Sequence, residues 1–148
     1  MHSFLNGIKT TKAKDLNTLY RDFEKSFPQG EAIRTRIDNA MTFIVELPEI
    51  HKSALMKPHI VYSLLLAISH SIDPIDNLAA VFIPAAPFVF QRDIVITNLT
   101  ALADALEADA PEEKFKLFVE ACSSKTNVET QRKTRVAWFG QALLPALI

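Results

Sequence analysis

The feature that most constrains the fold is the run Ile60–Ile68, IVYSLLLAI, which is apolar on every side of a helix. Pro58 stands just ahead of it, where proline favours a helix start, and Asp73–Pro74 closes it. A helix that is apolar all round has to be covered by other elements. We therefore place this helix at the centre of the fold.

Most of the remaining chain also has helical spacing. Apolar side chains recur at intervals of three and four residues in five further stretches, which are about Ala13–Phe27, Glu31 to just before Pro48, Val95–Leu106, Pro111–Cys122 and Val128–Leu143. Three glycines among 148 residues are too few for the many tight turns of a sandwich or barrel. We expect an all-α, single-domain bundle of about six helices around the central apolar helix, spanning residues 1–148.

The stretch Val81–Phe90, VFIPAAPFVF, fits this pattern least. Pro84 and Pro87 remove backbone donors, which excludes a central strand and a helix interior. We expect a buried connection, and the alternative is an exposed patch that docks another chain. The overlapping sequence FVFQRDIVI could begin as a strand, which is the main argument against an all-helical fold.

Residues that carry catalysis or bind metals are scarce. No two of the four histidines (His2, His51, His59 and His70) stand four residues apart, as two metal ligands on one helix face would. The lone Cys122 lies in an apolar helix pattern, typical of a packing residue. Nucleophile-elbow, Walker and dinucleotide-binding motifs are absent from the sequence. We therefore expect no catalytic residues, no cofactor and no metal, and an unrecognised site with His59 or His70 beside an acid is an alternative.

The N-terminal sequence MHSFLNGIKTTKAK lacks the apolar core of a secretory signal. The longest uncharged runs are shorter than the roughly 20 apolar residues that cross a bilayer. Together with the single cysteine, this indicates a cytoplasmic protein with no membrane contact.

Charge is distributed unevenly along the chain. Residues 1–36 hold seven basic and four acidic residues, residues 37–113 hold three and eleven, and residues 114–148 hold six and two. The basic ends would therefore attract the acidic middle or a phosphate-bearing partner.

One basic cluster near the C-terminus is a candidate phosphate or partner contact. It consists of Lys125, Thr126, Arg132, Lys133 and Arg135. Arg132 and Arg135 lie one turn apart, so two guanidinium groups could clamp a phosphate or carboxylate. The alternative is that these side chains pair with the acidic middle segment or cover apolar surface. Both arginines flank the apolar stripe, so we expect at least one to be partly buried and to have a partner.

The stretch Phe118–Leu143, FVEACSSKTNVETQRKTRVAWFGQAL, resembles the C-terminal end of GmrSD-type restriction proteins. The matching features are an apolar helix ending in small residues, then Thr126, then the two arginines, then a second apolar helix. His59–Ile68 also resembles the central helix of that family. The D-G-Q-Q-R motif that marks the family's ParB/sulfiredoxin-like catalytic half is absent from this chain.

This resemblance implies the C-terminal helical portion of a larger protein, without the catalytic half. Its expected role is a non-catalytic accessory domain of a DNA-targeting defence nuclease, with DNA or the nuclease domain as partner. The competing hypothesis is a protein-interaction or homo-oligomerisation domain unrelated to nucleases. Val81–Phe90 and the apolar terminus Leu143–Ile148 favour that second hypothesis.

Overall fold

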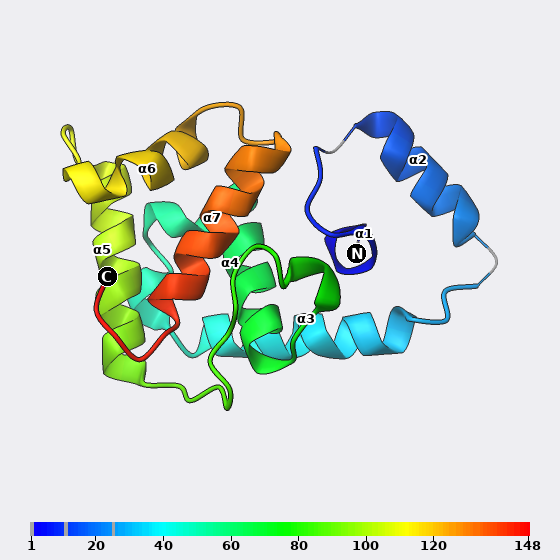
Figure 1. Ribbon diagram of the computed structural model, residues 1–148, viewed down its shortest axis with the longest axis horizontal. Coiled ribbons are helices and arrows are strands. Elements are labelled where there is room, and N and C mark those ends of the chain that lie inside the picture. Colours follow the sequence, from blue (N-terminus) through cyan, green and yellow to red (C-terminus); the bar gives the residue numbers. More distant parts are fainter. Residues whose placement is uncertain (1, 11, 25) are drawn as a thin grey trace.

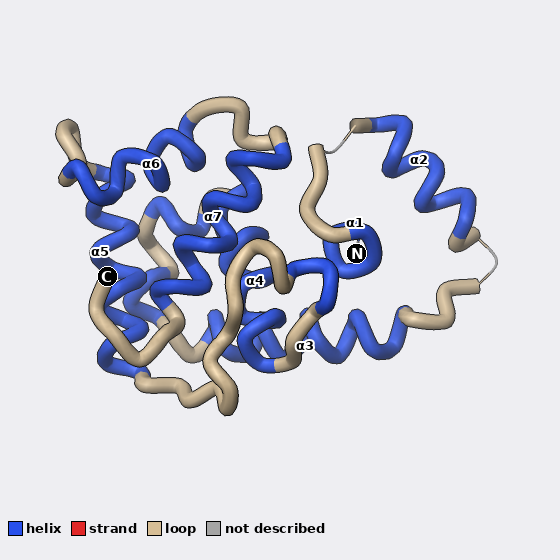
Figure 2. Tube along the Cα trace, viewed as in Figure 1, coloured by secondary structure: helices blue, strands red, loops and turns tan. Residues whose placement is uncertain are grey.

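The computed structural model describes residues 2–10, 12–24 and 26–148. Within these residues the chain forms seven α-helices and four short 3₁₀ helices and contains no strand (Figures 1 and 2). The α-helices are α1 (His2–Asn6), α2 (Ala13–Asp22), α3 (Gly30–Val45), α4 (Pro58–Ile72), α5 (Arg92–Glu107), α6 (Lys116–Ser123) and α7 (Glu129–Ala142). The 3₁₀ helices are Pro48–Ile50, Ala54–Met56, Asp76–Leu78 and Glu113–Phe115. The prediction of a helical bundle is confirmed.

Helix α4 lies at the centre of the bundle, as its sequence predicts. Pro58 occupies its first turn, and the helix ends one residue before Asp73. Leu64, Ala67 and Ile68 are completely buried, and α4 packs mainly against α7 and α3 (Figure 1). Covering a helix from several sides is how an element without a polar face is removed from water.

Helices α6 and α7 are joined by an aromatic cluster. The ring of Phe118 lies 5.5 Å from that of Phe139, edge to face, and Trp138 lies 5.7 Å from Phe115. The Ser123–Asn127 stretch ends α6 and turns the chain into α7, as its polar composition predicts. This places the predicted basic cluster on the turn and on the first half of α7.

The stretch Val81–Phe90 is an irregular connection between α4 and α5, and the strand considered for FVFQRDIVI does not form. Phe82, Phe88 and Phe90 pack against the core, whereas Ile83 is 83% exposed and Val89 is 53% exposed. The connection is therefore buried on one side and exposed on the other.

Two differences from the predicted elements concern the N-terminal region. Helix α2 ends at Asp22 rather than near Phe27, although Phe23 and Phe27 still pack edge to face at 4.8 Å. The short helix α1 was not predicted, because five residues are too few to establish a helical period.

The C-terminal tail is held against α5 by one buried amide. Asn98 Nδ2 donates to the carbonyls of Ala142 at 3.1 Å and Ala146 at 2.8 Å, and its Oδ1 accepts from the Ile148 N–H at 3.2 Å. The polar groups of Asn98 are thereby satisfied in an apolar setting.

Candidate functional site

Arg135, in the middle of α7, is buried and bound entirely within the protein. Its side chain is 2% exposed. Nε donates to Ser63 Oγ at 3.0 Å, Nη1 to the Ala121 carbonyl at 2.6 Å, and Nη2 to the Thr126 carbonyl at 2.8 Å. The expectation that one arginine of the pair is buried with partners is confirmed, and these partners are neutral. Arg135 ties α4, α6 and the turn before α7 together and does not reach an external phosphate.

Burial changes the ionisation of two groups in this region. Removal from water lowers the pKa of the Arg135 guanidinium from its usual value. The same effect raises the pKa of the Cys122 thiol to about 12, so that Cys122 is a protonated packing residue at neutral pH.

Arg132, one turn earlier on α7, binds the N-terminal segment. Its Nη1 donates to the Lys9 carbonyl and its Nη2 to Ser3 Oγ at 3.0 Å. The guanidinium carbon also lies 5.8 Å from the centre of the Tyr62 ring. Arg132 and Arg135 therefore point to different partners, and they do not form the joint clamp considered from their spacing.

A second bond attaches the N-terminal segment to the start of α7. The Glu129 N–H, in the first turn of that helix, donates to Thr10 Oγ at 3.0 Å. This hydroxyl satisfies one of the amide donors that a helix leaves unpaired at its N-terminus. Neither contact has a local sequence signal, because the partners lie more than a hundred residues apart.

The three remaining predicted residues lie on or before the first turns of α7. Lys133 is exposed and pairs with Glu129, with 2.6 Å between Nζ and Oε1, and this hydrogen bond lowers the pKa of the Glu129 carboxyl. Lys125 is exposed at a left-handed turn position, with a φ of 48°. Thr126 contributes its carbonyl to Arg135.

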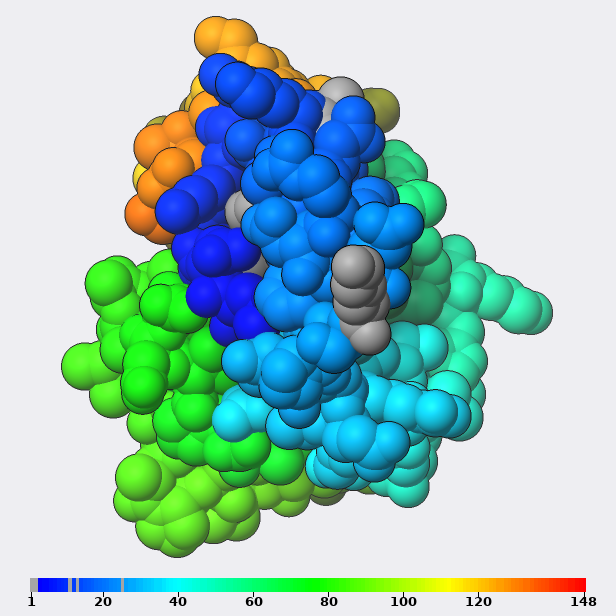
Figure 3. Space-filling view, turned by 90° about the vertical axis from the view of Figure 1, so that its right-hand side faces the viewer, coloured from blue at the N-terminus to red at the C-terminus, as the bar shows by residue number. Residues whose placement is uncertain are grey.

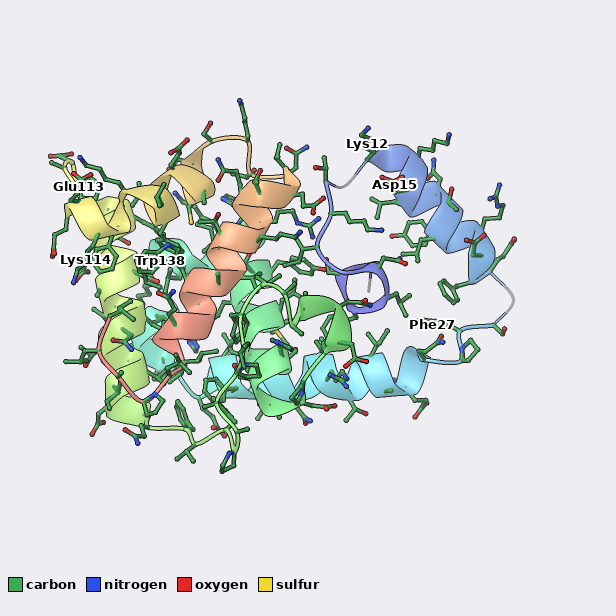
Figure 4. All side chains as sticks on the ribbon, in the orientation of Figure 1. Lys12, Asp15, Phe27, Glu113, Lys114 and Trp138 are labelled. Carbon is green, nitrogen blue, oxygen red and sulfur yellow. The ribbon has the colours of Figure 1, made fainter. Side chains whose placement is uncertain are left out.

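Docking of the N-terminal segment brings the two basic ends of the chain together (Figure 3). We call the result the basic surface, which consists of Lys9, Lys12, Lys14, Lys125, Arg132 and Lys133. Lys9 and Lys14 line an open hollow of about 360 Å³ between the N-terminal segment and α2, together with Asp15 and Asp22. Figure 4 places Lys12 at the start of α2 and the acidic Glu113 at the opposite end of the molecule.

The histidines have internal hydrogen-bonding roles. His70 is buried and bonds the Phe82 carbonyl through Nε2 at 3.1 Å and the Ile75 N–H through Nδ1 at 2.8 Å. His51 and His59 bond the carbonyls of Ile44 and Cys122 through Nε2. The side chain of His2 lies outside the described residues. In the part of the chain that the structure describes, no group of three His, Cys, Asp or Glu side chains is arranged to hold a metal ion.

The chain matches no family model, no curated protein and no solved structure. The likeness to GmrSD-type proteins therefore stays a prediction. None of the helices in the described ranges combines the length and the apolar character needed to cross a membrane.

Proposed function

We propose that this chain is a non-catalytic helical module that binds the phosphate backbone of a nucleic acid through the basic surface. The observation that carries the proposal is the docking of the N-terminal segment on α7, where Arg132 and the Glu129 N–H hold residues 3–10. Two stretches of positive charge from opposite ends of the chain thereby share one surface.

The composition of this surface suits contacts with phosphates. Five of its six basic groups are exposed lysines, of which Lys133 pairs with Glu129, and Asp15 and Asp22 are further acidic groups beside them. Long, exposed lysine side chains can follow a backbone of regularly spaced charges. Such contacts are independent of sequence and weaken as salt rises. With so few lysines we expect weak binding, as suits a module that assists another domain.

The finer role that we propose is accessory, in a DNA-targeting defence nuclease of the cytoplasm. It is supported by the resemblance of Phe118–Leu143 to GmrSD-type proteins and by the lack of a catalytic motif in the sequence. In that role, Arg135 positions the turn that carries Lys125, and the exposed lysines make the contacts.

The test is a binding titration of labelled duplex DNA at low salt with two matched triple variants. The first replaces Lys9, Lys125 and Lys133 by alanine, and the control replaces Lys52, Lys114 and Lys116, which are exposed elsewhere. Both variants lose the same amount of positive charge. Weaker DNA binding by the first variant alone therefore supports the proposal. Equal weakening in both variants, or no binding by the wild type, contradicts it.

A second candidate function is homo-oligomerisation or protein docking through the exposed side of the connection between α4 and α5. The specific observation in its favour is the exposure of Ile83 and Val89 on neighbouring parts of that connection. Light scattering after size exclusion tests it: a dimer mass that Ile83→Ser and Val89→Ser convert to a monomer supports this function, and a monomer at all concentrations contradicts it.

A further inference from the structure

A hollow between α3 and the last turn of α4 has the features of a small-ligand site, away from the basic surface. Its volume is about 290 Å³, at the small end of the range for ligand pockets. Its lining includes Arg36, Asn39, Ser69, Ile72 and Asp73. The two α3 residues lie three positions apart and face the end of α4.

An ion pair stands at this hollow. Arg36 Nη2 lies 2.7 Å from the Asp73 carboxylate, and Nη1 donates to the Asp73 carbonyl at 2.6 Å. The Asp73 side chain is 59% exposed, so its carboxylate can accept further hydrogen bonds. One positive and one negative group are thus fixed side by side.

Two polar groups of the hollow have no partner within the described chain. Ser69 is 2% exposed, and its hydroxyl is the one buried side-chain oxygen or nitrogen without a hydrogen bond among the described residues. The exposed Asn39 amide makes no hydrogen bond to any described residue. A buried hydroxyl without a partner is unfavourable, and a ligand that bonds to it removes that penalty.

We propose that this hollow binds a small zwitterion of the free α-amino acid class. A ligand with a single charge would be attracted by one member of the Arg36–Asp73 pair and repelled by the other. A zwitterion places its carboxylate beside Arg36 and Asn39 and its ammonium beside Asp73, and is attracted by both. The buried Ser69 hydroxyl accepts or donates once its side chain rotates toward the hollow, and Ile72 provides an apolar wall.

The experiment measures the thermal unfolding temperature, Tm, of the whole chain with single-compound probes. The zwitterions are glycine, L-alanine and L-serine, and the comparison compounds are acetate, methylammonium and glycerol. At a ligand concentration of about 100 times Kd a zwitterion should raise Tm by about 5–10 °C, and the comparison compounds at the same concentration should leave it unchanged.

Two variants and two controls assign the effect to the hollow. Without ligand, Asn39→Ala should keep the wild-type Tm, because this exposed side chain bonds to no described residue, and Ser69→Ala should keep or raise it, because it removes a buried hydroxyl without a partner. Both variants should lose the ligand-induced shift. Asn17→Ala, on exposed α2, and Ser71→Ala, also buried on α4, should retain the shift. The proposal is overturned if no zwitterion raises Tm, if acetate or glycerol raises it equally, or if the shift survives in Asn39→Ala.

Discussion

Two residues predicted from one pattern have different roles because their surroundings differ. Arg135 is surrounded by carbonyls and a hydroxyl inside the bundle, whereas Arg132 holds the N-terminal segment at the surface. Their spacing indicated that one of them would be buried. The identity of the partners was not predictable, because main-chain carbonyls are present at every position and become specific acceptors only when the fold brings them together.

At Arg135 we predict a large loss of stability on truncation. Arg135→Ala leaves Ser63 Oγ and two carbonyls without their donor in a buried site, which should lower the free energy of unfolding by about 2–4 kcal/mol. Lys133→Ala removes the exposed ion pair with Glu129 on the same helix and should change the free energy of unfolding by less than about 1 kcal/mol. Urea denaturation measures both values. Equal midpoints for Arg135→Ala and the wild type would refute the buried network.

At His70 we predict a dependence of stability on pH. Burial lowers the pKa of the His70 imidazole below its usual 6.5, an effect that the nearby Arg36 reinforces and the Phe82 carbonyl partly offsets. Between the lowered pKa and 6.5 the unfolded chain binds more protons than the folded one, so stability is present at higher pH and is lost as pH falls below about 6.5.

The measurement is the urea midpoint at a series of pH values for the wild type and His70→Gln. The glutamine variant should be less stable at neutral pH but lose less stability on acidification. If both proteins have the same slope against pH, His70 does not carry the effect.

At the scale of elements, α7 is positioned by close contact between its backbone and an aromatic ring, as well as by its apolar stripe. A Cβ atom added at Gly140 would lie 2.5 Å from Cγ of Phe82, so the ring of Phe82 rests directly on the helix backbone. The half-buried connection between α4 and α5 is therefore anchored to α7 at this point, and His70 binds the Phe82 carbonyl from α4.

We predict that Gly140→Ala destabilises the protein although alanine favours helices. The overlap with Phe82 should outweigh the gain in helix propensity, with a net loss of about 1–3 kcal/mol. Combining it with Phe82→Leu should give less destabilisation than the sum of the single changes. Additive effects in the double-mutant cycle would contradict the contact.

The elements were predictable where a long stretch has a strong apolar or polar composition, and not where the segment is short or held by distant contacts. Helix α4 follows from a run without a polar face, and the break at residues 123–127 follows from its composition. Helix α1 and the docking of Thr10 on α7 have no such local signal. The hollow beside α3 was also not predicted, since Arg36 and Asp73 are 37 residues apart.

At the scale of the whole molecule, the fold brings the two basic ends of the chain together. The basic surface lies where the N-terminal segment meets α7. At the other end of the molecule, beyond Trp138, Glu113 and Lys114 lie near each other (Figure 4). The attachment of residues 3–10 is thus required for the proposed function as well as for packing.

We predict that Arg132→Ala and Thr10→Ala together loosen this attachment. Their combined loss should increase amide hydrogen exchange in residues 3–10 while leaving α4 protected, because these hydrogen bonds attach the N-terminal segment to α7, whereas α4 is held mainly by its packing against α3 and α7. Hydrogen exchange with mass spectrometry measures this. Unchanged exchange in residues 3–10 would mean that other contacts hold the segment.

The most direct test of the account is the salt dependence of DNA binding by the wild type and by the variant that lacks Lys9, Lys125 and Lys133. The logarithm of the binding constant should fall linearly with the logarithm of salt concentration, with a slope of about −0.9 for each phosphate neutralised. We predict a shallower slope for the triple variant, together with weaker binding at every salt concentration. Identical slopes for the two proteins, or no binding by the wild type at the lowest salt, would contradict a nucleic-acid contact on the basic surface.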